Sequence, residues 1–495
     1  MADFDLAIIG GGINGAGIAR DAAGRGLKVL LVEQSDLASG TSSASSKLIH
    51  GGLRYLEHGA FGLVRASLAE REVLLRIAPH LVRPLRFVLP LDPSRRSSLA
   101  IRLGLALYDR LARRDILPPA RRLDLLRDAA GEPLRTAFHQ GFEFSDCRGD
   151  DARLVLVNAV DAAERGALIR TRTRCTRGER GSEWRLILNA HGQREVVSAR
   201  VLVNATGAWA ETFIETALRA KPRGRLRLVK GSHIVVRRLY DHERAYILPT
   251  RDRRVVFTIP FERDFTLIGT TDLDFSGDPG AVLPTLAEID YLCDAANDYF
   301  RTAIVAADMV WAFAGVRALY GPQSRKPQDV GRDYYLVLDK RYGEAPSLTV
   351  YGGKLTMYRR LAENVLRQLA HFFPPSRPWT AQAPLPGGDF AYDALSGLIE
   401  ATQRRWPFLT AAHAQRLACA YGTRVENILK TAARLDDLGM RFGGDLTAAE
   451  VRHLMANEWA QTADDVLWRR SKLGLRFSEA QRATLDRFMA QESGR

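Results

Sequence analysis

Residues 5–15 read Asp-Leu-Ala-Ile-Ile-Gly-Gly-Gly-Ile-Asn-Gly, an apolar run followed by a glycine turn. The apolar run is typical of a strand, and Gly10, Gly12 and Gly15 satisfy the pattern G-x-G-x-x-G. Residues 16–23 then read as a helix, and residues 28–32 as a second strand that ends on Glu33. Glycines let a backbone approach a pyrophosphate at a helix N-terminus, and an acid about 20 residues further on accepts hydrogen bonds from a ribose. This order predicts a Rossmann-type dinucleotide-binding unit rather than a glycine-rich turn without a ligand.

A hydroxyl-rich segment follows, because residues 41–57 read TSSASSKLIHGGLRYLE. Its serines, lysine and glycines suit a chain that passes close to a phosphate and a flat ring. His50, Arg54 and Tyr55 add a proton acceptor, a fixed cation and a phenol. A solvated linker is the alternative. Linkers stay polar, however, whereas this segment becomes apolar and aromatic over residues 53–56.

Two later segments have patterns typical of chain segments that contact the same dinucleotide again. Residues 201–207, Val-Leu-Val-Asn-Ala-Thr-Gly, predict a strand that ends in Ala-Thr-Gly, and Trp209 follows. Residues 351–356, Tyr-Gly-Gly-Lys-Leu-Thr, precede a helical stretch from 357 to 369, whose N-terminus can face the electron-rich end of a flavin. The second turn alone would be an ordinary turn. Three separate segments that contact one ligand favour a long dinucleotide that is buried along its length, and therefore FAD rather than NAD.

On these segments the chain resembles the FAD-dependent, aerobic glycerol-3-phosphate dehydrogenases, within the amine and amino-acid oxidase-like flavoproteins. The most specific matches are SSKLIHGGLRYLE at 45–57, LIGTTD at 267–272, GKLT at 353–356 and DVLWRRSKLGL at 465–475. The sequence has no Asp-x-Asp-x-Asp-Gly calcium loop near its C-terminus, so the resemblance is to the bacterial type.

The resemblance implies an α/β fold with a Rossmann-type FAD-binding domain, an antiparallel β-sheet substrate or cap domain, and a C-terminal helical domain. The expected boundaries are 1–75, 146–230 and 340–375 for the FAD-binding domain, 76–145 for a basic amphipathic insertion, 231–339 for the β-rich cap, and 385–495 for the helical domain.

The activity implied is oxidation of sn-glycerol 3-phosphate to dihydroxyacetone phosphate by hydride transfer to FAD, with electrons passed to ubiquinone or another membrane quinone. A homodimer on an anionic lipid surface at the cytoplasmic side of the inner membrane is expected. One alternative is a flavin-dependent amine or amino-acid oxidase of the same fold. A flavin-containing RNA-binding or RNA-modifying protein is less favoured. The basic stretch 95–127 contains only Tyr108 as an aromatic for base stacking, so no nucleic-acid partner is expected.

Motifs and resemblance together give a set of predicted cofactor-binding residues. They are Gly10, Gly12, Ile13, Asn14, Gly15, Glu33, Thr41, Ser42, Ser46, Lys47, His50, Gly51, Ala205, Thr206, Gly207, Trp209, Gly353, Lys354, Leu355 and Thr356.

The reaction also requires a proton acceptor and residues that bind the substrate phosphate. His50 and His233 are the candidate bases, since unperturbed imidazole titrates near pH 6.5; the sequence does not choose between them. Arg317 joins them as a predicted catalytic residue, and arginine offers phosphate a bidentate fork. The predicted substrate-binding residues are Arg54, Tyr55, Thr270, Arg317 and Lys354.

Composition limits the remaining possibilities. The 495 residues suffice for two or three domains. The four cysteines form no C-x-x-C pair, which argues against a disulfide framework or a metal site and suits a reducing, cytoplasmic compartment. The first predicted strand begins almost at once, so no leader peptide is expected, and no apolar stretch is long enough to span a bilayer. The net charge of +14 favours an anionic partner.

Residues 98–114 predict an amphipathic helix within the basic stretch. Its apolar face is formed by Ala100, Leu103, Leu107 and Leu111, its opposite face by Arg102, Asp109 and Arg113, and one flank by Arg110 and Arg114. An apolar body with a basic rim is typical of a helix in a membrane interface. Packing on the protein's own core is the alternative.

Overall fold

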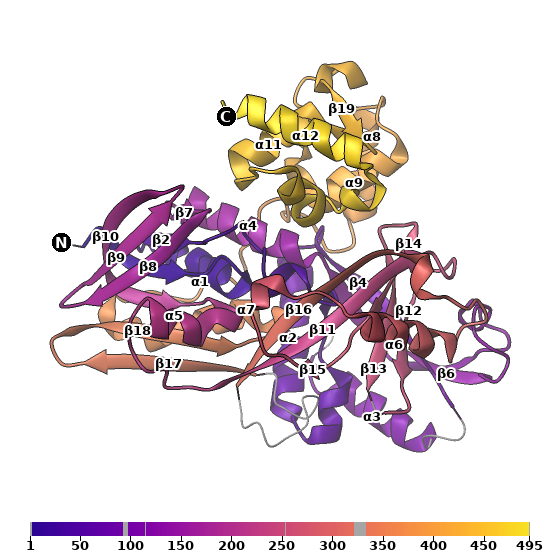
Figure 1. Ribbon diagram of the computed structural model, residues 1–495. Coiled ribbons are helices and arrows are strands. Elements are labelled where there is room, and N and C mark those ends of the chain that lie inside the picture. The colour runs from indigo at the N-terminus through magenta and orange to yellow at the C-terminus, as the bar shows by residue number, and fades with distance from the viewer. Residues whose placement is uncertain (1, 93–97, 114, 253, 321–332, 495) are drawn as a thin grey trace.

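Two sheets form the body of the molecule, and a helical C-terminal domain lies over their junction (Figure 1). The computed structural model describes residues 2–92, 98–113, 115–252, 254–320 and 333–494. Arg114, the last residue of the predicted amphipathic helix, lies outside the described residues. The predicted fold class, a Rossmann-type domain with a β-rich cap and a helical C-terminal domain, is confirmed.

The first sheet has the strand order β17-β18-β10-β1-β2-β7. All neighbours from β18 to β7 are parallel. Leu6, Ala7 and Ile8 of β1 are fully buried, as expected for a parallel strand covered on both faces. The strands are β1 Phe4–Ile9, β2 Val29–Val32, β7 Leu168–Arg170, β10 Gln193–Asn204, β17 Tyr334–Arg341 and β18 Glu344–Gly352, with β8 Thr173–Arg180 and β9 Trp184–Ala190 added beside β10.

Helix α1 (Ile13–Gly24) packs against α4 (Asp151–Glu164) and α7 (Tyr358–Gln368). Small residues of α1 permit this close approach, because a Cβ at Gly17 would lie 2.7 Å from the Tyr358 ring. Arg20 of α1 forms a buried ion pair of 2.5 Å with Asp161 of α4. Helix α1 is thereby held with its N-terminus at the glycine turn.

The second sheet has the order β15-β11-β14-β13-β12-β4-β6-β3, with β16 beside β11 and β5 beside β6. It is antiparallel except where β12 runs parallel to β4. The strands are β3 Leu48–Ile49, β4 Val82–Pro90, β5 Arg121–Asp124, β6 Gln140–Gly149, β11 Leu226–Arg237, β12 Ala245–Pro249, β13 Val255–Phe261, β14 Phe265–Gly269, β15 Leu273–Asp274 and β16 Met309–Tyr320. Helix α6 (Leu286–Asn297) packs on β11, β13 and β14.

The sheets divide the chain differently from the predicted domain boundaries, and two segments show this most clearly. Strands β4, β5 and most of β6 lie in the segment 76–145, expected to be an insertion, but they belong to the cap sheet. Strand β17 lies mostly within 231–339, expected to be cap, but it pairs with β18 at the edge of the first sheet. Strand pairing between distant segments determines both memberships, and the local sequence pattern does not specify it.

Helices α2 (Phe61–Ile77) and α3 (Ser98–Arg110) join strands of the second sheet, α2 between β3 and β4 and α3 between β4 and β5. The predicted helix 98–114 ends earlier, at Arg110, where the Asp109 carboxylate accepts a 2.7 Å hydrogen bond from the Ala120 backbone and draws the chain back. Leu105 and Tyr108 are buried, whereas Leu99, Leu103 and Leu107 are exposed. The exposed stripe therefore includes Leu103 and Leu107 as predicted, but Leu111 is half-buried.

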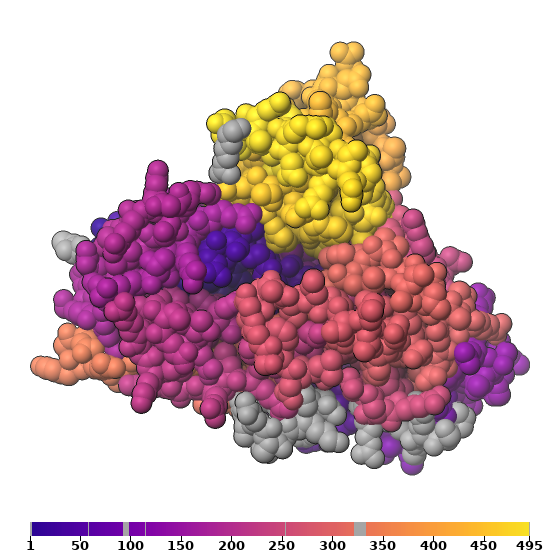
Figure 2. Space-filling view, viewed as in Figure 1, coloured from indigo at the N-terminus to yellow at the C-terminus, as the bar shows by residue number. Residues whose placement is uncertain are grey.

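The C-terminal domain has its own hydrophobic core. Its helices are α8 Leu395–Arg405, α9 Ala411–Tyr421, α10 Glu426–Leu429, α11 Ala448–Glu458 and α12 Glu479–Glu492, with a hairpin of β19 Arg441–Gly443 and β20 Leu446–Thr447 and a π-helical turn η12 Asp465–Arg470. In Figure 2 this yellow domain rests on both the magenta and the orange parts of the molecule, and the indigo N-terminal region is visible between them.

Buried charges attach the C-terminal domain to the first sheet. Asp36, three residues after Glu33, pairs with Arg470 and Arg469 of η12, and the Asp36 and Arg470 side chains are fully buried. Asp465 pairs with Arg172 at 2.7 Å. Burial alone would raise the pKa of Asp465, but the neighbouring arginines lower it to about 2. The Asp465 carboxylate is therefore ionised where the domains meet.

We expect Asp36→Ala to lower the free energy of unfolding by about 3–5 kcal/mol, because the buried Arg470 would lose the carboxylate with which it pairs. The midpoint and slope of urea unfolding measure this change. Asp115→Ala is the control, since Asp115 pairs with Arg76 at an exposed position and should change stability by less than about 1 kcal/mol. Equal midpoints for the two variants would contradict the role given to Asp36.

Candidate functional site

A cleft of about 870 Å³ lies between the two sheets and the C-terminal domain. Its walls come from the β1–α1 turn, the segment from Glu33 to His50, the start of β8, the end of β10, strand β16, the glycine turn after β18, and η12. The carboxyl ends of the parallel strands thus open into it, which is where ligands bind in doubly wound sheets.

The β1–α1 turn lets the backbone come unusually close to the next strand. Gly10 has a φ of +113°, and a Cβ there would lie 2.5 Å from the Ala205 carbonyl oxygen. A Cβ at Gly15 would lie 1.9 Å from the Gly10 carbonyl oxygen. The predicted residues Gly10, Gly12, Ile13 and Asn14 line the cleft, whereas Gly15 does not, because its role is this packing.

Glu33 occupies the end of β2 on the cleft wall. Its carboxylate accepts hydrogen bonds from the backbone of Gly11 at 2.7 Å and of Ser35 at 2.8 Å. Burial raises the pKa of Glu33, and the two N–H donors oppose that rise. The two bonds fix the carboxylate at the mouth of the glycine turn, the position a ribose-binding acid requires.

The hydroxyl-rich segment crosses the cleft and is held at several points. Ser42 Oγ accepts a 3.0 Å bond from the Ile13 backbone, and Thr41 donates a 2.6 Å bond to the Val316 carbonyl. Lys47 does not line the cleft, because its ammonium pairs with the buried Asp151 at 2.9 Å. Lys47 therefore anchors the segment from behind.

The late glycine turn meets the same segment from the other side. Lys354 Nζ donates a hydrogen bond to the His50 carbonyl, and the His50 backbone donates a 3.2 Å bond to Thr356 Oγ1. Asn14 donates 3.2 Å to the Gly352 carbonyl, while its buried Oδ1 has no partner among the described residues. An unpaired buried acceptor beside the glycine turn suits a ligand that donates a hydrogen bond.

The two candidate bases occupy different layers. His50 lines the cleft, whereas His233 does not and is almost fully buried. His233 Nε2 lies 2.8 Å from Ser46 Oγ, and Ser46 does line the cleft. Burial, followed by the charges of Arg317 and Lys47, holds the pKa of His233 well below its ordinary value, so the imidazole is neutral.

Arg317 projects into the cleft from β16 and is held in place by the loop after β14. It pairs with Asp272 and donates a 2.9 Å bond to Thr270 Oγ1. Space for the guanidinium exists because residue 231 is a glycine, whose Cβ would lie 2.7 Å from Arg317 Nη2. Tyr55 and Lys354 line the cleft nearby, with Lys354 Nζ 5.2 Å from the centre of the Tyr55 ring.

Most predicted residues line this cleft, and a minority do not. The lining residues among them are Gly10, Gly12, Ile13, Asn14, Glu33, Thr41, Ser42, Ser46, His50, Tyr55, Ala205, Thr206, Gly207, Trp209, Arg317, Gly353, Lys354 and Leu355. Those that do not line the cleft are Gly15, Lys47, Gly51, Arg54, His233, Thr270 and Thr356.

The structure adds residues that the sequence did not assign. Arg174 and Cys175 of β8 line the cleft near Glu33, and their short strand carries no motif. Trp311, Phe313, Trp468 and Arg469 also line it. The aromatic run 311–317 and the conspicuous segment 465–475 were signals for these four, but nothing in the sequence placed them at one site.

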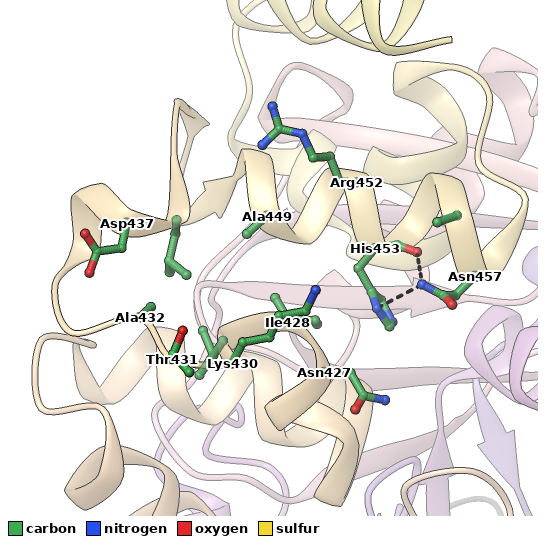
Figure 3. A pocket seen from close by; sticks show the side chains of 13 residues that line it. Asn427, Ile428, Lys430, Thr431, Ala432, Asp437, Ala449, Arg452, His453 and Asn457 are labelled. Carbon is green, nitrogen blue, oxygen red and sulfur yellow. Dashed lines mark hydrogen bonds between the residues drawn. The ribbon is translucent and has the colours of Figure 1, made fainter.

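A second hollow, of about 620 Å³, lies inside the C-terminal domain between α10 and α11. In Figure 3 the His453 and Asn457 side chains are bonded to each other, and Arg452 points away from α10. Arg452 pairs with Glu492 at 2.8 Å, and Asp437 accepts hydrogen bonds from backbone groups of its own turn. Because these charges do not converge on a common point, the cleft between the sheets is the candidate active site.

Comparison with known proteins assigns the chain to a family. The sequence model described as "FAD dependent oxidoreductase" matches residues 5–359. The chain belongs to this family. A second model, "C-terminal domain of alpha-glycerophosphate oxidase", matches residues 378–493. FAD is therefore the cofactor of this flavoenzyme, as predicted, and the glycine turn, Glu33 and the three converging segments provide a cradle that fits it.

Individual relatives cover nearly the whole chain. A glycerol-3-phosphate dehydrogenase of Pseudomonas aeruginosa is 51% identical over 99% of this chain and 95% of its own. A D-erythritol 1-phosphate dehydrogenase of Brucella abortus is 47% identical over 97% of this chain and 96% of its own. The solved structure of a glycerol-3-phosphate dehydrogenase from Bacillus halodurans complexed with FAD is 27% identical, with a TM-score of 0.79 over 99% of this chain and 91% of that one.

We expect Gly10→Ala to lower FAD affinity by roughly tenfold or more, since the methyl group would strain a positive φ and press on the Ala205 carbonyl. The ratio of flavin to protein absorbance after dialysis measures retention. Gly62→Ala is the matched control, because a Cβ on this helical glycine meets open space. Full retention of FAD by Gly10→Ala would contradict the role of the turn.

Proposed function

We propose that the protein oxidises sn-glycerol 3-phosphate to dihydroxyacetone phosphate, with the hydride passed to FAD. The observation that carries this proposal is the meeting of a proton acceptor and phosphate-binding cations in the cofactor cleft, namely His50, Arg317 and Lys354. The name of the Pseudomonas aeruginosa relative supports the same substrate.

In this reaction the hydrogen on C2 leaves as a hydride, with both electrons of the C–H bond. The hydroxyl proton passes to a base, and a carbonyl forms at C2. Bound FAD supplies the two-electron acceptor. His50 lies in the cleft, and neutral His233 lies within hydrogen-bond distance of Ser46 at the cleft surface. Both imidazoles are therefore candidates to take the proton, His50 directly and His233 through the Ser46 hydroxyl.

Arg317 is the proposed phosphate-binding residue. Its planar fork suits bidentate contact with phosphate oxygens, and Asp272 and Thr270 hold it in one orientation. Lys354 and Tyr55, which line the cleft, are proposed to bind the substrate beside it. Thr270 and Arg54 do not line the cleft, and their predicted part in substrate binding stays a prediction. The remaining predicted cofactor residues are proposed to contact FAD or to shape its cradle.

A second substrate follows from one of the relatives. The Brucella abortus protein is named for D-erythritol 1-phosphate, which has the same terminal phosphate and a longer polyol chain. Because the proposed phosphate-binding residues would suit both glycerol 3-phosphate and D-erythritol 1-phosphate, the two substrates are compared in the experiment below. No relative quoted above is named for an amine or amino-acid substrate, so the oxidase alternative has less support.

We expect anaerobic glycerol 3-phosphate to bleach the bound flavin, and Arg317→Ala to lower the second-order rate of bleaching by roughly tenfold or more, through loss of a charge-assisted contact. The loss should shrink when unphosphorylated glycerol is the substrate. Arg185→Ala, an exposed cation on β9, is the control. Faster bleaching by D-erythritol 1-phosphate would reassign the substrate, and no bleaching by either would refute the proposal.

We further propose that the protein works at an anionic membrane surface and passes electrons to a membrane quinone. Helix α3 supports this by exposing Leu99, Leu103 and Leu107 next to exposed Arg102 and Arg110. Within the described ranges, no helix is long and apolar enough to cross a bilayer. The cytoplasmic face of the inner membrane and a homodimer remain predictions.

We expect Leu103→Glu combined with Leu107→Glu to release the protein from anionic vesicles, because burying two carboxylates in the interface opposes insertion of the stripe. Co-sedimentation at physiological salt measures binding. Turnover with a soluble dye should persist, while turnover with a long-chain quinone in vesicles should fall. Leu126→Glu, another exposed leucine outside α3, is the control. Unchanged co-sedimentation would show that α3 does not contact the membrane.

A further inference from the structure

Four aromatic rings run in one continuous stack from the C-terminal domain to the buried imidazole. The Trp468 ring of η12 packs on Trp311 with centroids 4.6 Å apart. Trp311 packs on Phe313 at 4.5 Å, and Phe313 packs on His233 at 4.9 Å with the two planes only 11° apart.

Strand register produces the inner part of this stack. Trp311 and Phe313 are two residues apart on β16, so their side chains share one face of the cap sheet. On the neighbouring strand β11, Phe313 is paired with His233. On the far side, His233 is paired with Gly269 of β14. The three rings are thus neighbours across one sheet face.

Glycines close both ends of the stack. A Cβ at Gly269 would lie 2.1 Å from the His233 ring, and a Cβ at Gly474 would lie 2.5 Å from the Trp468 ring. The rings are therefore confined between two pieces of backbone that leave no room for a side chain.

The imidazole itself has few polar constraints. His233 Nε2 lies 2.8 Å from Ser46 Oγ, but the buried Nδ1 has no hydrogen-bond partner among the described residues. The single hydrogen bond to Ser46 would by itself leave the His233 ring free to turn about the axis of that bond. Contact with Phe313 on one face and Gly269 on the other removes this freedom.

The outer end of the stack is held by the domain interface. Trp468 lies between Asp465 and Arg470 in the chain, whose side chains are paired with Arg172 and Asp36 of the FAD-binding part. Lys472 donates a 2.6 Å bond to the Trp468 carbonyl. These contacts fix the position of η12 against the cap strand.

We propose that Trp468 is a positioning residue through which the C-terminal domain orients the His233 imidazole toward Ser46. The inference rests on the proposed function in giving His233 a part in proton transfer. It assigns the C-terminal domain a share in the active site.

The test is a double-mutant cycle in the FAD-loaded protein, using Trp468→Ala, His233→Asn and the combined variant. Anaerobic reduction of the flavin by saturating glycerol 3-phosphate is followed by stopped-flow absorbance. We expect Trp468→Ala to slow reduction by roughly ten- to a hundredfold, as misplacement of a reacting group does. Combined with His233→Asn, it should add nothing. Trp468→Phe should restore most of the rate.

Two controls separate this role from general loosening. Arg424→Ala removes an exposed ion pair with Glu164 elsewhere between the C-terminal domain and α4, and it should reduce at the wild-type rate. If Trp468→Ala fails to fold, Gly474→Ala replaces it in the cycle, because its methyl group displaces the indole without removing it. Multiplicative effects in the combined variant, or equal slowing by Arg424→Ala, would overturn the proposal.

A spectroscopic readout keeps the proposal independent of the substrate. In protein carrying ¹³C-labelled histidine, the His233 Cε1 resonance is assigned by its absence from His233→Asn. Trp468→Ala should shift this resonance and Arg424→Ala should not, whichever molecule reduces the flavin. An unmoved resonance would refute positioning by Trp468. A normal rate for His233→Asn with a shifted resonance would instead refute the part of His233 in the proposed function.

Discussion

Close contact between the β1–α1 turn and the end of β10 is the constraint on which the rest of the structure depends. Gly10 approaches the Ala205 carbonyl so closely that no side chain fits between them. This contact brings the N-terminus of α1 and the end of β10 to one point. The hydroxyl-rich segment then bonds to the turn through Ser42 and Ile13, and the late glycine turn through Asn14. Three distant parts of the chain thus form one cradle.

The sequence predicted the elements whose signals are local. The strand, glycines, helix and Glu33 lie within one short segment, and their spacing alone specifies the geometry that the cofactor needs. Contacts over long separations could not be predicted in this way. Lys47 has the residue type of a phosphate ligand, yet its partner is Asp151, 104 positions later. His233 lies behind Ser46 because of a register between β11, β14 and β16 that no local pattern reveals. Strand β17 likewise joins the first sheet through pairing alone.

The partners of the buried arginines likewise depend on tertiary structure and not on the local sequence pattern. Arg20, Arg71, Arg153 and Arg470 are almost fully buried, and each is paired with a carboxylate, respectively Asp161, Asp146, Glu458 and Asp36. Since each pair is neutral, removing the four leaves the surplus of +14 to the rest of the chain. These four buried arginines therefore do not account for the positive surplus, and the charge that favours an anionic partner belongs to other residues.

The position of η12 sets the order in which the active site can be assembled during synthesis. The first sixth of the chain contains the glycine turn, Glu33 and the hydroxyl-rich segment, which are therefore synthesised early. Trp468 and Arg469 lie near the end of the chain. A nascent chain can therefore form the first part of the cradle early but lacks one wall of the cleft. The buried Asp36 has no Arg470 to neutralise it until that stage. Asp36 must accordingly stay hydrated while translation proceeds, and the arrival of η12 completes the wall of the cleft.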